Sequence, residues 1–245
     1  ATDQNVTVVL GTSGTATEGT DYTDGSGAVD DITITAGSTT GTVSFTPTDD
    51  SIYEGNETAT IAISSVTGEA SESGTQAVTI TITENESAPT VTLTTSATSI
   101  AENAGSSLTL TATLSVATTA NVSVALSTSG TGTEGSGGDY ATISDITISA
   151  GSTTGTATFT PTDDSTFEGD ETAIIDIDSV SGGSASENGT QRVTITISED
   201  DAGAALSIND VTTSDESAGD ATFTVTMSTA SSSTVTVDYA TTASS

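Results

Sequence analysis

Residues 108–114 read Leu108-Thr-Leu110-Thr-Ala112-Thr-Leu114, an unbroken alternation of apolar and polar side chains. Successive side chains of a β-strand point to opposite faces, so this pattern places the apolar residues on one buried face. The same alternation returns on both sides of this stretch, at Val91 and Leu93, at Val122, Val124 and Leu126, at Ile143 with Ile146 and Ile148, at Ala157 and Phe159, at Ala173, Ile175 and Ile177, and at Val193, Ile195 and Ile197. The sequence therefore predicts an all-β, seven-stranded sandwich whose strands are separated by Gly, Ser and Asn turns.

The composition agrees with an immunoglobulin-like sandwich that has a thin core of small aliphatic side chains. Thr, Ser, Gly, Ala and Val dominate the chain, which has no Cys, no His, no Trp and only 3% aromatic residues. Thr and Val suit a pleated, half-buried surface. The chain carries 34 acidic residues against one basic residue, a net charge of −33, which argues against binding to nucleic acid or to an anionic membrane surface.

Internal repeats divide the chain into domains. Residues 49–58 (DDSIYEGNET) return as residues 163–172 (DDSTFEGDET), and residues 31–42 match residues 145–156. A repeat of roughly 115 residues is a whole domain, since solenoid repeats span about 20–50 residues. We predict a repeat at 1–86 that lacks its first strands, a complete repeat at 87–202, and the opening strands of a third repeat at 203–245. Tandem domains with short linkers predict an elongated rod.

Two explanations fit the partial repeats at either end. The sequence is cut from a longer polypeptide, or neighbouring chains complete each other's domains by donating strands. Residues 5–10 and 234–239 both match the strand that begins at Asn121. Joining one tail to the next head would duplicate that strand, which favours a cut piece.

Acidic residues gather at one end of the predicted sandwich. If the strands run alternately up and down, the loops after strands one, three and five meet the end of strand seven at one pole. In the middle repeat this pole receives Glu102, Asp139, Asp163, Asp164, Glu168, Glu171, Glu199, Asp200 and Asp201. Converging carboxylates repel without a cation, and oxygen ligands without His or Cys select a hard ion. Ca²⁺, which takes six to eight oxygens in flexible geometry, fits better than Mg²⁺.

A single acidic residue in a loop is usually just solvated, but the doubled Asp and its fixed spacing to two Glu recur in both repeats. Asp176 and Asp178 alternate with Ile175 and Ile177, so we expect them on an outer sheet face as solubilising, edge-protecting charges.

The acidic motif, the Asp139-Tyr140 pair and the closing Glu199-Asp200-Asp201 resemble the Calx-beta domain, and the likeness runs along essentially the whole chain. That family is an immunoglobulin-like sandwich found as a calcium sensor of sodium/calcium exchangers and as tandem arrays in large secreted bacterial proteins. The resemblance implies the nine ligands already named for the middle repeat. It adds Asp21, Asp49, Asp50, Glu54, Glu57, Glu84 and Glu86 in the first repeat, where Asn85 replaces an acid, and Glu216 in the third.

The tandem copies and the extreme acidity look like the secreted arrays. We expect a calcium-binding structural segment of an extracellular fibre, adhesin or matrix protein, secreted or at the cell surface, whose inter-domain calcium stiffens the array. Its partners would be neighbouring repeats of the same or an identical chain, with lateral fibre assembly or a cell-surface or glycan target beyond them, and no inserted membrane segment. The alternatives are a calcium-sensing regulatory module and a glycan-binding or surface-binding adhesion module. We do not expect an enzyme, because paired carboxylates stand without His, Cys or an aromatic-lined cleft.

Overall fold

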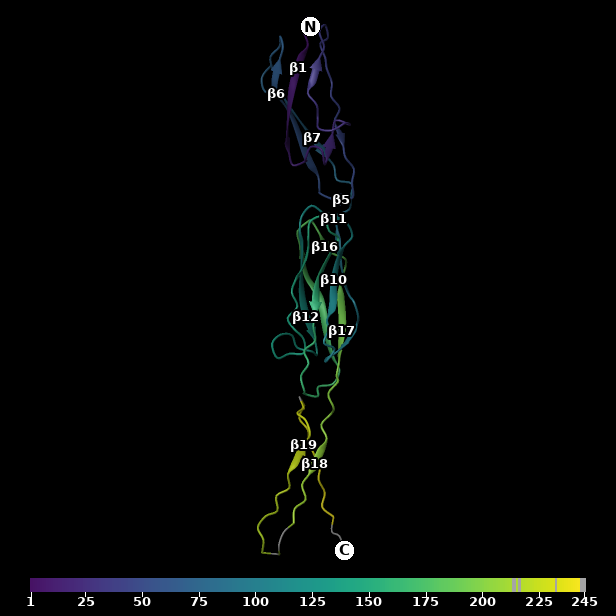
Figure 1. Cartoon of the computed structure of the whole chain (residues 1–245), viewed down its shortest axis with the longest axis vertical. Coiled ribbons are helices and arrows are strands. Elements are labelled where there is room, and N and C mark those ends of the chain that lie inside the picture. Colours follow the sequence, from purple (N-terminus) through teal and green to yellow (C-terminus); the bar gives the residue numbers. More distant parts are fainter. Residues whose placement is uncertain (213–214, 216, 232, 243–245) are drawn as a thin grey trace. The chain divides into compact units, whose positions relative to one another are not determined.

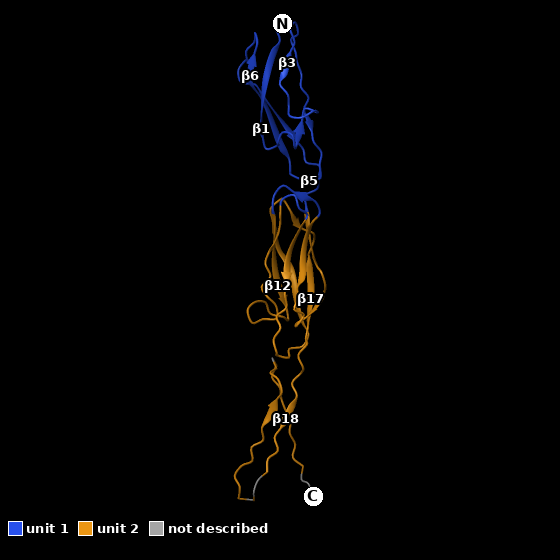
Figure 2. Ribbon diagram, viewed as in Figure 1, with its two compact units in different colours: residues 1–89, 115–121, 150–153 blue, residues 90–114, 122–149, 154–245 orange. Residues whose placement is uncertain are grey.

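The computed structural model describes residues 1–212, 215, 217–231 and 233–242, and every regular element in these ranges is a β-strand (Figure 1). The prediction of an all-β fold is confirmed. Two compact units divide the chain (Figure 2): unit 1 comprises residues 1–89, 115–121 and 150–153, and unit 2 the remainder. The division into repeats at 1–86, 87–202 and 203–245 stays a prediction, because the two compact units do not follow the sequence repeats. Within the described ranges, no helix is long and apolar enough to cross a membrane.

Unit 2 contains a sandwich of two sheets. One sheet has the order β14 (Thr154–Phe159), β10 (Leu108–Leu114), β8 (Thr90–Thr95) and β16 (Ser186–Glu187). The other has the order β13 (Ile146–Ile148), β12 (Val122–Gly130), β15 (Glu171–Ser181), β17 (Arg192–Ser198) and β9 (Ser99–Ala101). The apolar face of each sheet contributes to a single core, as the alternating pattern predicts.

The core of unit 2 is well covered on both sides. Leu110 from the first sheet and Ile175 and Ile195 from the second are fully buried, and Phe159 packs against Tyr140 with ring centroids 5.0 Å apart. The seven predicted strands are confirmed, although Ile143 lies outside β13. Three short strands were not predicted: β9, β16 and β11 (Ala117–Thr118).

Asp176 and Asp178 alternate with buried Ile175 and Ile177 as expected, but the edge-protecting role is wrong. β15 lies between β12 and β17, so its charges stand on a central strand. Asp176 there pairs with the guanidinium of Arg192 at 2.6 Å.

Unit 1 contains one main sheet, in the order β3 (Ile32–Ile34), β1 (Val6–Gly14), β6 (Glu57–Thr67) and β7 (Ala77–Ile82). This order repeats β13-β12-β15-β17, including an irregularity in register at Val9/Leu10 that matches Ala125/Leu126. The smaller pairs are β2 (Tyr22–Thr23) with β4 (Thr46–Pro47), and β5 (Ile52–Tyr53) with β11.

The tail of the chain belongs to unit 2 and contains a short antiparallel pair of strands. β18 (Leu206–Ile208) pairs with β19 (Val225–Met227), and the side chains of Leu206, Ile208 and Val225 are exposed.

Candidate metal centre

Acidic side chains from four separate loops converge at one end of the unit 2 sandwich. Glu102 follows β9, Asp139 lies between β12 and β13, Asp164 and Glu168 lie between β14 and β15, and Glu199 follows β17. Their carboxylate oxygens form three groups whose members lie within 4.8 Å of one another: Glu102, Glu199 and Asp200; Glu102, Asp164 and Glu168; and Asp139, Glu168 and Glu171. Since Glu102 and Glu168 each belong to two groups, the clusters are continuous.

A buried tyrosine holds Asp139 in place. Tyr140 is 1% exposed and packs on Phe159, so the residue before it must stand at the rim of the core. The backbone N–H of Thr133 donates to Asp139 Oδ2 at 2.6 Å, and the Thr133 hydroxyl donates to the same oxygen at 2.9 Å. Burial opposes ionisation of Asp139, but these hydrogen bonds lower its pKa overall.

Glu199 joins the loop before β15 to the chain after β17. Its Oε2 accepts the N–H groups of Glu168 at 2.6 Å and Gly169 at 2.8 Å, and its Oε1 accepts those of Asp200 at 3.0 Å and Asp201 at 2.8 Å. Gly169 has a φ of 83°, a conformation that side chains other than glycine rarely adopt. The four N–H groups lower the pKa of Glu199 against the effect of desolvation, so this carboxylate stays ionised.

Two neighbouring carboxylates, Glu102 and Glu171, have pKa values above their ordinary range. Burial, followed by the charges of Glu199 and Asp164, raises the pKa of Glu102 to about 7, although an N–H from Asp164 donates to it at 3.2 Å. Burial and the hydrogen bond and charge of Asp139 raise the pKa of Glu171 to about 7. Crowded, desolvated carboxylates of this kind favour the binding of a cation.

Asp201 supplies an independent sign of an absent partner. Its Oδ2 is buried and has no hydrogen-bond partner, whereas the backbone N–H of Asp201 donates to Glu199. Burial and the charges of Glu199 and Asp200 raise the pKa of Asp201. Buried polar atoms normally have a partner, so an unpaired carboxylate oxygen beside an acidic cluster indicates a cation ligand.

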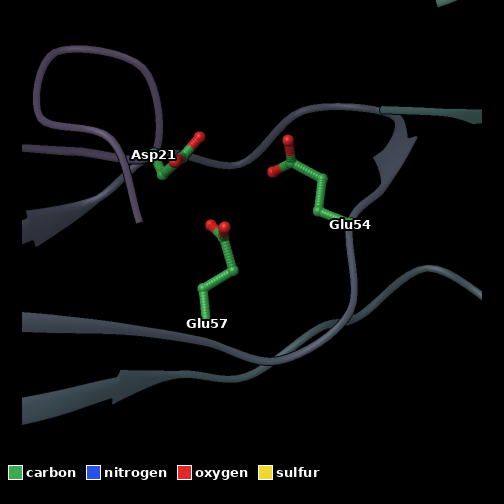
Figure 3. A group of neighbouring side chains, drawn as sticks. All are labelled: Asp21, Glu54 and Glu57. Carbon is green, nitrogen blue, oxygen red and sulfur yellow. The ribbon is translucent and has the colours of Figure 1, made fainter. Parts of the chain in front are cut away.

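Unit 1 repeats part of this arrangement. Asp21, Glu54 and Glu57 offer oxygens within 4.8 Å of one another, and Figure 3 shows the three side chains directed toward a common space. Asp21 precedes Tyr22, which is 1% exposed and stacks on Phe45, in the place where Tyr140 packs against Phe159 in unit 2. Burial and the charges of Asp21 and Glu54 raise the pKa of Glu57 to about 7.

Glu84 and Glu86, the acidic residues that follow β7, line a pocket together with Asp21, Glu54 and Glu57. Glu84 Oε2 accepts the N–H groups of Glu54 at 2.6 Å and Gly55 at 2.8 Å, the counterpart of the Glu199 contacts. These bonds and the one from Glu86, acting against desolvation, lower the pKa of Glu84 to about 2. Asp50 also lines the pocket.

Asp49 has a different partner. It accepts a hydrogen bond from the Asn85 amide at 2.8 Å, so this Asn ties the acidic motif to the chain after β7 where the second repeat has the acid Asp200. Fewer acids therefore gather here than in unit 2.

Six predicted ligands among the described residues belong to none of these groups: Asp49, Asp50, Glu84, Glu86, Asp163 and Asp201. Asp163 is exposed, and Glu216 lies outside the described residues. Sequence reasoning also missed the side chains that orient the ligands. Thr133 holds Asp139, Asn103 donates to Asp200, and Asp170 accepts the N–H of Glu199 at 3.0 Å. The position of Asp170 between Glu168 and Glu171 was the available signal.

The donor set fits Ca²⁺. Its members are carboxylates with backbone partners, the chain contains no His and no Cys, and several loops contribute, as the flexible oxygen coordination of calcium allows. In unit 2 the residues that would hold the ion are Glu102, Asp139, Asp164, Glu168, Glu171, Glu199, Asp200 and Asp201.

Comparisons with known proteins agree with the repeat pattern. The Calx-beta domain family matches residues 1–86 and 84–201. Similar solved structures include the crystal structure of CBD12 from CALX1.2, with 13% identity, 81% of this chain and 89% of that chain covered, and a TM-score of 0.36. Another is the crystal structure of calcium binding domain CBD12 of CALX1.1, with 12% identity, coverages of 80% and 88%, and a TM-score of 0.31. No curated protein sequence matches the chain.

Proposed function

Because the chain belongs to the Calx-beta family, we propose that it is a calcium-binding structural segment of an extracellular fibre, adhesin or matrix protein. The convergence of seven carboxylates of unit 2, with the buried and unpaired oxygen of Asp201 beside them, carries this proposal. Bound Ca²⁺ would supply the positive charge that the cluster lacks. The family supports a calcium-related module in general, and the fibre role rests on the tandem repeats and on the net charge of −33.

The protein's own residues explain why an ion would stiffen the chain. Glu199 already ties Asp200 and Asp201, which follow β17, to the loop at Glu168. Ions held by the two groups that share Glu102, one with Glu199 and Asp200 and the other with Asp164 and Glu168, would join three segments that are distant in sequence. Residues 199–203 would then lose their freedom to swing, and neighbouring repeats, the proposed partners, would be held in a rod.

The alternatives differ in what calcium changes. A regulatory module needs a surface that is altered by occupancy, whereas a structural segment needs only stability and stiffness. A glycan-binding adhesion module would use the Thr-rich outer faces, and it would bind its target without dependence on the acidic cluster. Enzymatic activity is not expected of such a module.

Small-angle scattering in calcium and in chelator tests the structural proposal. We expect a longer maximum dimension in calcium and a more compact, heterogeneous particle in chelator, at physiological ionic strength and at the lowest measurable concentrations. The doubly substituted chain Asp200→Asn/Asp201→Asn keeps every strand, and it should lose the calcium-dependent elongation. If it elongates as the unaltered chain does, the ion acts only within each domain and the rod proposal is wrong.

The matched control is Asp178→Asn, which removes a charge from an exposed position on β15 away from the acidic cluster. This variant should elongate in calcium like the unaltered chain.

A further inference from the structure

Glu134 is an acidic residue of the loop between β12 and β13, and it belongs to none of the carboxylate groups found among the described residues. Its two oxygens have partners at opposite ends of that loop. The hydroxyl of Thr128 on β12 donates to Glu134 Oε2 at 2.6 Å, and the backbone N–H of Ile143 donates to Oε1 at 2.7 Å. The carboxylate therefore joins the end of β12 to the chain that leads into β13.

The first repeat contains the same arrangement. The Thr12 hydroxyl donates to Glu18 Oε2 at 3.0 Å, and the N–H of Val29 donates to Oε1 at 2.5 Å. In both repeats the threonine lies 6 residues before the glutamate. The accepted N–H lies 11 residues after the glutamate in the first repeat and 9 residues after it in the second. Because the contacts persist while the loop length changes, they are not an accident of one loop conformation.

The residue before Glu134 is the one that holds the carboxylate ligand of this loop. The N–H and the hydroxyl of Thr133 both donate to Asp139 Oδ2, and the Thr133 carbonyl accepts the N–H of Asp139 at 2.8 Å. Gly138 lies so close that a Cβ added to it would stand 2.5 Å from the Thr133 carbonyl oxygen. A shift of Thr133 would therefore move Asp139 with it.

The first repeat keeps this link as well. Thr17 precedes Glu18, and its N–H donates to Asp21 Oδ2 at 2.5 Å. Asp21 and Asp139 are the residues that these loops contribute to the carboxylate groups. The glutamate, the threonine before it and the aspartate ligand thus recur as a unit.

We propose that Glu134 is a positioning residue for calcium. It fixes Thr133, which directs the carboxylate of Asp139 toward the cluster before an ion arrives, and it does not bind the ion itself. A ligand that is already ordered in the ion-free chain loses less conformational freedom on binding, so the ion binds more tightly. Glu18 has the same role toward Asp21. This role rests on the proposed calcium binding of the cluster.

Two substitutions separate the contacts of Glu134 from its charge. In Glu134→Gln the amide oxygen can accept the N–H of Ile143, and the amide nitrogen can donate to the hydroxyl oxygen of Thr128. This variant keeps both contacts and loses the charge, whereas Glu134→Ala loses both contacts as well. A positioning role predicts weaker calcium binding for the Ala variant alone. Attraction by charge or direct coordination predicts weaker binding for both.

Calcium titration of the whole chain, followed by nuclear magnetic resonance, tests this role. The amide signals of Glu168 and Gly169 report on the unit 2 cluster, because both N–H groups donate to Glu199. Glu134→Ala should raise the calcium concentration at half-saturation by about tenfold, since two hydrogen bonds that order the loop are lost. Glu134→Gln should stay close to the unaltered chain. Equal weakening in the two variants overturns the role.

A measurement without calcium separates positioning from general stability. In chelator, hydrogen exchange of the Thr133 and Asp139 amides should speed up in Glu134→Ala, while the amides of β15 and β17 keep their protection. If β15 and β17 lose protection to the same degree, Glu134 merely supports the fold and the role is wrong.

The matched control is Asp145→Ala. Asp145 Oδ1 accepts the N–H of Leu126 at 3.0 Å, so this variant also removes a carboxylate that bonds across the connection between β12 and β13. It should leave calcium binding unchanged, because the lost bond does not involve Thr133.

A substitution of the ligand itself completes the test. In Asp139→Ala, Glu134 has no ligand to position, so adding Glu134→Ala should weaken calcium binding little further. A full additional loss means that Glu134 acts on the ion by another route, and it overturns the role. A chain that binds calcium equally well with Ala or Glu at position 134 overturns the role too, while leaving the proposed function in place. An unaltered chain that binds no calcium overturns both.

Discussion

Replacing Glu102 by Gln should change the stability of unit 2 in opposite directions with and without calcium. Glu102 is 8% exposed and accepts an N–H from Asp164, a bond that the amide oxygen of Gln can also accept. The substitution therefore removes the charge while keeping the shape and this contact. Any large effect then reports on the carboxylate itself.

The sign without calcium follows from the pKa of Glu102. Burial raises it from 4.5 to about 7, so the folded chain holds a proton at pH values where the unfolded chain has released it. The contribution of protonated Glu102 to the free energy of unfolding is fully present below pH 4.5, and it is lost as the pH rises through about 7. At about 1.4 kcal/mol per pH unit, the loss at pH 8 reaches about 3 kcal/mol. In chelator at pH 8, Glu102→Gln should therefore stabilise unit 2 by up to about 3 kcal/mol.

With calcium present the same change should destabilise. An ion bound only by the folded chain adds about 4 kcal/mol at a thousandfold excess over its Kd, and a variant lacking one ligand keeps only part of that. Hydrogen exchange of the amides in β15 and β17, followed by mass spectrometry at pH 8, reports on unit 2 alone. Asp178→Asn, which removes a charge outside the cluster, should have little effect in either condition. A loss of stability of the same size for Glu102→Gln in calcium and in chelator would refute the reasoning, because it would make Glu102 a purely structural residue.

Three further outcomes are expected. Asp164→Asn should weaken calcium binding at unit 2 by tenfold or more in titration calorimetry, because it removes a clustered charge, while Asp178→Asn leaves it unchanged. The melting temperature of the unaltered chain should fall in excess chelator, and an unchanged value would argue against any structural ion. Ile195→Ala should destabilise its unit by about 2–5 kcal/mol in hydrogen exchange, whereas Ile80→Ala should cost clearly less, since Ile80 is only partly buried. Equal costs would contradict the difference in burial between the two side chains.

Local sequence patterns determined the strands and the gathering of acids at one pole. The alternation in residues 108–114 is a property of neighbouring side chains, so it predicts a strand without knowledge of the rest of the chain. The up-and-down order of strands then placed Glu102, Asp139 and Glu199 at the same end, and the structure brings these loops together. The acidic motif and the closing acids gave the family resemblance in the same way, because both are runs of neighbouring residues.

Only the tertiary structure decided which acids meet and what surrounds them. The loops could have brought Asp163 into the cluster as readily as Asp164, and packing alone left Asp163 exposed while burying an oxygen of Asp201. Asp176 was expected on an outer sheet face as an edge-protecting charge, yet the strand order places it on a central strand, where it pairs with Arg192. Residues 154–159 form β14 by pairing with β10, a partner that no local pattern can supply. The burial of side chains, the distances between carboxylates and the pairing of strands depend on segments that are far apart in sequence, so only the fold determines them.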